Sequence, residues 1–166
     1  MQIPEVGSFL GYFEGIRGRT ERVIATIPPD QLEWRPRAAA FSSGDLIRHL
    51  AATERYMFAE NVAGRPSRYP GHGHELAAGY TNVVAYMRDM HAEAVAIFAT
   101  LTPAELQLPC TTPAGTPITR WKWLRAMVEH EIHHRGQIYL LLNLLEVPTP
   151  PLYGLTSEQV KANSIA

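Results

Sequence analysis

Metal-binding side chains are densest in the segment His130-Glu131-Ile132-His133-His134-Arg135-Gly136-Gln137. His130 and His134 are four residues apart, so in a helix their imidazoles project from one face, about one turn from each other. Histidine pairs with this spacing can bind one transition-metal ion. His133 projects to one side of the pair, and we expect it in solvent or beside a ligand. The segment therefore predicts part of a metal site on a helix.

A third histidine, His49, belongs to an earlier helical segment and shares its inner face with Leu46 and Leu50. A buried imidazole is costly unless it is hydrogen-bonded or bound to a metal. A lone core histidine usually only packs and hydrogen-bonds, but coordination accounts for three that point into one interior. We therefore predict that His49, His130 and His134 bind one divalent transition metal, with packed core histidines as the alternative.

Three imidazole ligands leave room for water or a substrate at the metal. A zinc-like ion makes hydroxide available near pH 7, and it can equally bind a thiol as thiolate. The candidate catalytic residues are Glu131, Tyr56 and Gln137. Glu131 is a possible general base, although solvent is its favoured environment. Tyr56, two turns after His49, and Gln137, one turn after His134, are placed to orient water or substrate, or else simply to pack.

The spacing His130-Glu131-x-x-His134 also matches the zincin signature, in which the glutamate activates zinc-bound water. No further Gly-x-x-His follows it, and the chain shows no strand-rich segment that would hold an extended peptide. A true zincin is therefore disfavoured.

Helices must position these residues, because apolar side chains recur at three- and four-residue steps and no strand-like alternation of useful length occurs. The expected helices cover about Glu5–Ile27, Ser42–Val62, Ala77–Leu101 and Thr119–Glu146. Residues 63–76 are a turn-rich connection, and a small hairpin is expected around Ala114-Gly115. The sequence thus predicts an all-α four-helix bundle, with residues 1–166 forming a single domain.

Several other residues have ordinary structural interpretations. Trp34 is expected to pack, Arg135 to pair with an acidic side chain, and Cys110 to be an inert small residue. Surface positions are expected for His72, His74 and His91, and the tail is expected to pack Leu152 and Tyr153 on the bundle.

An apolar stripe, Val128, Ile132 and Tyr139, lies opposite the predicted metal face of the last helix. A homodimer would cover this stripe, and so would the Pro-rich segment 107–117. The two explanations are equally favoured by the sequence.

The composition restricts the class of protein. A hydrophobic fraction of 46% and a charged fraction of 19% are those of an ordinary globular chain, and a net charge of −1 disfavours nucleic acid and anionic membranes as partners. One cysteine cannot form an intramolecular disulfide, and neither a secretion leader nor a membrane-spanning run is indicated. We therefore expect a cytoplasmic protein.

The Trp34-Arg35-Pro36 loop, the His49 helix and the ending His130-x-x-x-His134-Arg135-Gly136-Gln137 resemble the DinB superfamily, which includes YfiT-like metal hydrolases and bacterial thiol transferases. The resemblance extends over nearly the whole chain, down to Leu152-Tyr153-Gly154. It implies an up-down-down-up bundle, often dimeric, with nickel or zinc bound by residues matching His49, His130 and His134. It implies little about the substrate.

Three functional hypotheses follow. The first is a metal-dependent enzyme acting on a small molecule, either a transferase that uses a low-molecular-weight thiol or a hydrolase. The second is a non-catalytic metal-binding or stress-related bundle, and the third is a bundle whose histidines only pack. Nickel and zinc are the favoured metals, while iron, cobalt and copper also suit three imidazoles.

Overall fold

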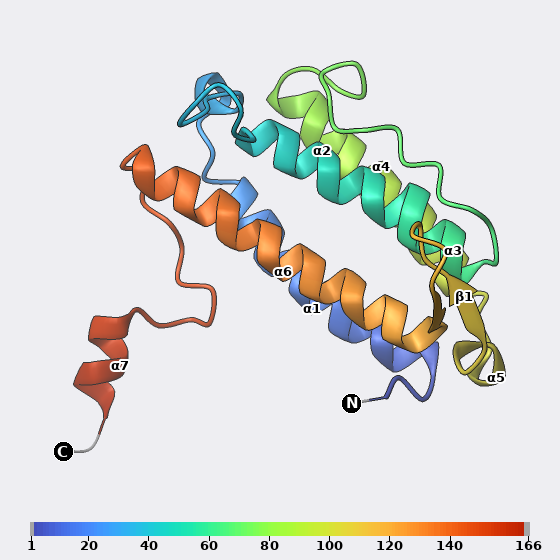
Figure 1. Cartoon of the computed structure of the whole chain (residues 1–166). Coiled ribbons are helices and arrows are strands. Elements are labelled where there is room, and N and C mark those ends of the chain that lie inside the picture. The colour runs from blue at the N-terminus through green and yellow to red at the C-terminus, as the bar shows by residue number, and fades with distance from the viewer. Residues whose placement is uncertain (1, 165–166) are drawn as a thin grey trace.

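The structure is a computed structural model that describes residues 2–164. It is an all-α bundle, as predicted, with one small antiparallel hairpin at the end where α6 begins (Figure 1). The long helical segments are α1 (Val6–Ile24), α2 (Ser43–Thr53) continued by the π-helical η2 (Glu54–Ala59) and α3 (Glu60–Val62), α4 (Tyr80–Phe98) and α6 (Arg120–Leu144). The short elements are η1 (Pro29–Gln31), α5 (Pro103–Leu106), β1 (Pro109–Thr111), β2 (Pro117–Thr119) and α7 (Ser157–Asn163).

The helix boundaries follow local chemistry. Ser42 and Asp45 form a reciprocal capping box that starts α2, with 2.9 and 3.0 Å between the side-chain oxygens and the backbone nitrogens. Thr119 holds the N-cap position of α6, as predicted, but its side chain accepts no capping hydrogen bond. The predicted hairpin is present, with Cys110 opposite Ile118. Helix α7 was not expected from the sequence.

The long helices are arranged as two neighbouring pairs, α1 with α6 and α2 with α4 (Figure 1). Residues 63–79 run back along the bundle before α4 begins, instead of forming a short hairpin between neighbouring helices. A long return is the connection that the expected up-down-down-up order requires. That order itself stays a prediction.

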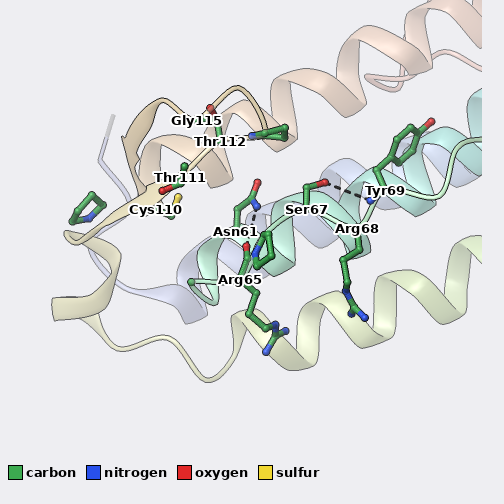
Figure 2. A pocket seen from close by; sticks show the side chains of 13 residues that line it. Asn61, Arg65, Ser67, Arg68, Tyr69, Cys110, Thr111, Thr112 and Gly115 are labelled. Carbon is green, nitrogen blue, oxygen red and sulfur yellow. Dashed lines mark hydrogen bonds between the residues drawn. The ribbon is translucent and has the colours of Figure 1, made fainter.

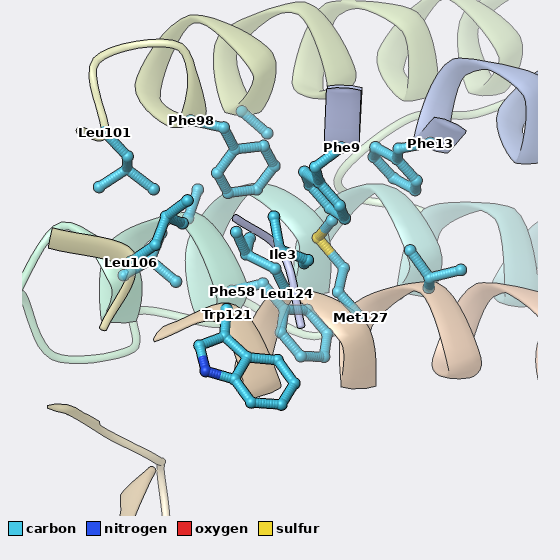
Figure 3. Packing of buried hydrophobic residues seen from close by; sticks show 14 of the residues in the cluster. Ile3, Phe9, Phe13, Phe58, Phe98, Leu101, Leu106, Trp121, Leu124 and Met127 are labelled. Carbon is cyan, nitrogen blue, oxygen red and sulfur yellow. The ribbon is translucent and has the colours of Figure 1, made fainter. Parts of the chain in front are cut away.

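Two apolar clusters fill the bundle. The first lies towards α5 and is built around phenylalanines and leucines of four helices, including Phe9, Phe13, Phe58, Phe98 and Leu124 (Figure 3). The second lies towards the other end and includes Ile47, Val83, Ile138 and Leu142, with Trp34 packed against it as predicted. Close packing of both clusters provides the main stabilisation of the fold.

A buried polar layer separates the two clusters. Arg17 of α1 binds Glu54 of η2 and contacts Glu131 of α6 at 3.0 Å, and Thr20 donates to Glu131 at 2.6 Å. His91 of α4 completes the layer, with its Nδ1 at 2.7 Å from Glu54. All four long helical segments therefore contribute to one charged network.

This layer corrects three expectations. His91 and Glu131 do not lie at the surface, because their partners Glu54 and Arg17 are inside the bundle. Arg135 is also buried, and its guanidinium donates to the backbone carbonyl of Ile16 at 3.3 Å instead of pairing with an acidic side chain. Surface placement is confirmed for His74.

The apolar stripe on α6 is partly covered within the monomer. Val128 is buried in the cluster that contains Ile3, Phe9 and Cys110, and it borders one hollow together with Ile3 and Phe9. Ile132 remains 39% exposed. The tail packs Leu152 on the bundle as expected, whereas Tyr153 stays largely exposed. Within residues 2–164, none of the helices combines the length and the apolar composition that crossing a membrane would need.

The polar layer predicts a large effect of removing its cation. Replacing Arg17 with methionine leaves Glu54 and Glu131 buried without a guanidinium, which costs about 3–5 kcal/mol of unfolding free energy. Urea denaturation followed by circular dichroism measures this loss. The matched control is Arg88→Met, since Arg88 forms a surface pair with Glu21 at 3.5 Å, and we expect it to change stability by less than about 1 kcal/mol. Equal effects of the two substitutions would contradict the role given to the layer.

Candidate metal centre

Three imidazoles from two helices meet beside the polar layer. His49 comes from α2, and His130 and His134 come from α6. The Nε2 atom of His130 lies 3.1 Å from Nε2 of His49 and 3.1 Å from Nε2 of His134. One ligand atom from each residue can be chosen so that all three lie within 4.8 Å of one another. The structure thus brings together the three residues that the sequence singled out.

Hydrogen bonds on the outer nitrogens set the direction of the lone pairs. The amide oxygen of Gln137 lies 2.6 Å from Nδ1 of His134 and can only accept, so His134 donates there and keeps its lone pair on Nε2. The Tyr69 hydroxyl lies 2.7 Å from Nδ1 of His49 and 3.1 Å from Nδ1 of His72. If His49 donates to this hydroxyl and the hydroxyl donates to His72, then His49 also presents a bare Nε2.

The surroundings keep these histidines neutral. Burial, with smaller contributions from neighbouring histidines, lowers the pKa of His49 to about 4 and that of His130 to about 3. Burial also lowers the pKa of His134, against the opposing effect of its hydrogen bond to Gln137. Neutral imidazole is the form that binds a metal ion.

The arrangement fits a divalent transition metal. Nε2 lone pairs that face one another at 3.1 Å repel unless a proton or a cation lies between them. The depressed pKa values of His49 and His130 oppose the additional proton of an imidazolium ion at neutral pH. Nitrogen donors of this type suit zinc, nickel, copper, cobalt and iron.

The three candidate catalytic residues have different surroundings. Gln137 adjoins the triad through its bond to His134. The carboxylate of Glu131 faces Arg17 and Thr20 inside the bundle, so the expectation of a solvent position is wrong. Burial raises the pKa of this carboxyl group.

Tyr56 lies in the π-helical segment η2, with the guanidinium carbon of Arg55 5.1 Å from the centre of its ring. No hydrogen bond found among residues 2–164 joins Tyr56 to the triad. Tyr56 is instead partly buried and packs against the second apolar cluster.

Two loop residues of the site were missed by the sequence analysis. Tyr69 was not considered, and His72 was expected at the surface, but both contribute to the chain of hydrogen bonds that reaches His49. Both lie in the irregular segment 63–79, where helical periodicity gives no information. The one sequence signal that could have pointed to this loop is Tyr69, an aromatic residue in a Gly- and Pro-rich connection. His133 is exposed beside His134, as expected.

Tyr69 also borders a groove of about 870 Å³ between the segment 64–69 and the β1–β2 hairpin. Figure 2 shows Asn61, Ser67, Thr111 and Cys110 along this groove. Burial raises the pKa of the Cys110 thiol, which agrees with the expectation of an unreactive residue. The groove gives the region around Tyr69 an approach from solvent.

The low pKa values predict how the metal-free protein responds to acid. Histidines whose folded pKa lies below the ordinary value of 6.5 bind protons more readily when unfolded, so stability is lost as the pH falls from about 6.5 to about 4. We expect the Tm of chelator-treated protein to decrease over this range, and to decrease less in His130→Ala. Thermal melts at several pH values check this. An equally steep decrease in the variant would assign the effect to other groups.

The Tyr69 hydroxyl predicts a positioning effect on metal binding. Tyr69→Phe removes the group that orients His49, and we expect zinc affinity to fall by about tenfold or more with the helical content unchanged. Competition against a chromophoric chelator measures the affinity, and Tyr12→Phe at an exposed position serves as the control. Unchanged affinity in Tyr69→Phe would show that the hydroxyl does not hold His49.

The model of the DinB superfamily matches residues 12–138 of this chain. The uncharacterized protein YjoA of Bacillus subtilis (strain 168) is 25% identical over 147 residues, covering 87% of this chain and 93% of the relative. Two crystal structures share the fold. A DinB-like protein from Bacillus cereus ATCC 10987 has a TM-score of 0.74 at 15% identity, covering 89% of this chain and 97% of that chain. The YjoA structure has a TM-score of 0.69 at 21% identity, covering 87% and 96%. The chain belongs to the DinB superfamily.

Proposed function

We propose that this protein is a metal-dependent enzyme that binds one divalent transition metal, nickel or zinc, through His49, His130 and His134. The observation that carries the proposal is the convergence of three Nε2 atoms, two pairs of them 3.1 Å apart. The low pKa values of His49 and His130 support it, since these side chains are neutral imidazoles at neutral pH, the form that binds a metal ion. Iron, cobalt or copper would suit the same ligands.

The proposed reaction class is transfer of a low-molecular-weight thiol or hydrolysis, in either case on a small molecule. A bound divalent ion supplies a Lewis acid that lowers the pKa of a bound water or thiol. Gln137 and Tyr69 hold the imidazoles of His134 and His49 in the orientation that directs their Nε2 atoms to one point. The groove beside Tyr69 supports access of a small molecule.

We extend the proposal to a homodimer in the cytoplasm. Ile132 and Tyr12 are exposed beside a hollow of about 190 Å³ that Val128 also lines, and a second copy packed there would cover them. A single cysteine requires no oxidising compartment.

Metal analysis of the untagged protein tests the centre directly. We expect near-stoichiometric metal in the unmodified protein, a Tm that falls on chelation, and loss of metal in His49→Ala, His130→Ala and His134→Ala. His133→Ala and His74→Ala, which remove exposed histidines, are matched controls that should retain the metal. Absence of metal together with melting unaffected by chelator would overturn the proposal.

The enzymatic part of the proposal has its own readout. A panel of thiols with electrophiles, and of small esters and amides, should reveal a turnover that His130→Ala abolishes. Tight metal without any turnover on this panel would instead support a non-catalytic metal-binding or stress-related role.

A further inference from the structure

A second hollow, of about 480 Å³, lies directly beside the triad. Its volume falls within the range of about 300–1,000 Å³ that is usual for small-molecule sites. The side chains that define it are Arg37, Phe41, Leu46, Gln137, Leu140 and Leu141. None of these residues is a predicted metal ligand.

The hollow continues the two helix faces that carry the triad. Leu46 precedes His49 by three residues, and Gln137 follows His134 by three, so each lies about one turn beyond a histidine on the same side of its helix. Gln137 links the hollow to the triad, since it lines the hollow and accepts a hydrogen bond from Nδ1 of His134 at 2.6 Å. A molecule in the hollow is therefore next to the proposed metal.

Phe41, in the loop before α2, lies between the hollow and the triad. Its ring centre lies 6.1 Å from that of His49 and 4.5 Å from that of His72. Phe41 thus contacts the triad region on one side and lines the hollow on the other.

The walls favour an apolar ligand. Two apolar side chains of the hollow are exposed, Leu140 at 58% and Phe41 at 38%, whereas Leu46 and Leu141 form its buried floor. Covering the exposed surfaces of Leu140 and Phe41 with an apolar group is favourable, because it removes apolar area from water.

One cation adds a preference for negative charge. Arg37 lines the hollow, and no carboxylate pairs with it among residues 2–164. Arg35, two residues earlier, is instead bound to Asp45 at 2.7 Å. A guanidinium beside an apolar surface matches a carboxylate attached to an apolar body.

We propose that this hollow binds an organic monocarboxylate with a small apolar body, its hydrocarbon part against Phe41, Leu140 and Leu141 and its carboxylate at Arg37. As the site of a substrate, this assignment rests on the proposed metal-dependent function. As a binding site, it depends only on the residues of the hollow.

Octanoate is the probe that tests the assignment, with octylammonium and 1-octanol as matched ligands of opposite and zero charge. In calorimetric titrations of the full chain as purified, we expect octanoate to bind at least about tenfold more tightly than octylammonium. Arg37→Gln should weaken octanoate by about tenfold and leave 1-octanol within about twofold. No octanoate binding, or equal binding of the two charged ligands, would overturn the proposal.

Two leucines of α6 provide a matched pair of variants. Leu140→Glu places a carboxylate in the hollow and should weaken octanoate by more than about tenfold. Leu144→Glu changes a leucine that is 56% exposed outside the hollow and should stay within about twofold. Equal weakening by both variants would place binding elsewhere.

The test of octanoate binding can be distinguished from the test of the metal centre. His130→Ala should lose metal but keep octanoate binding within about twofold, because His130 does not line the hollow. A protein without metal that still binds octanoate in this pattern would overturn the proposed metal centre and support the proposed ligand site in the hollow. Metal binding without octanoate binding would support the metal centre and overturn the ligand site.

Discussion

The guanidinium of Arg17 binds two buried carboxylates between the two apolar clusters of the bundle. Glu54 and Glu131 are both buried, and each would be costly to remove from water without a cation. Because Arg17, Glu54 and Glu131 come from α1, η2 and α6, their pairing requires these segments to meet at one level along the bundle. The apolar clusters on either side supply most of the stability, but they would tolerate small shifts of one helix along another. The charged layer does not tolerate such shifts, so it specifies the alignment of the helices.

The triad depends on that alignment. Neighbouring residues of a helix differ by about 100° in direction, so α6 directs Glu131 towards α1 while His130 and His134 face α2. The same turn of α6 thus contributes to the charged network and to the candidate metal centre. Two of the three imidazoles come from one rigid helix, and His49 comes from another whose start is fixed by the Ser42–Asp45 capping box. Sites built on such elements hold their geometry better than sites built on loops.

Loops contribute what the helices cannot. The return segment 63–79 brings Tyr69 and His72 to the outer nitrogen of His49, and the loop before α2 brings Phe41 against both histidines. These contacts orient the imidazole of His49, and the same loops supply Tyr69 to the groove and Phe41 to the hollow. Under the proposed function, the triad would be the reactive centre and the hollow would bind the non-reacting part of a substrate, where binding energy is gained.

Local periodicity alone determined the four helices, the inward faces of α2 and α6, and the histidines on them, because the spacing of residues along one helix decides which side chains point together. Tertiary structure decided the rest. The environment of Glu131 depends on Thr20 and Arg17, more than a hundred residues earlier in the chain, and only the packing of α1 on α6 brings them together. Tyr56 packs against the second apolar cluster from a π-helical segment that residue spacing did not predict. Tyr69 and His72 joined the site because a loop of irregular conformation passes over it. Contacts of this kind are set by burial and by hydrogen bonding between distant segments, and the order of residues along the chain does not display them.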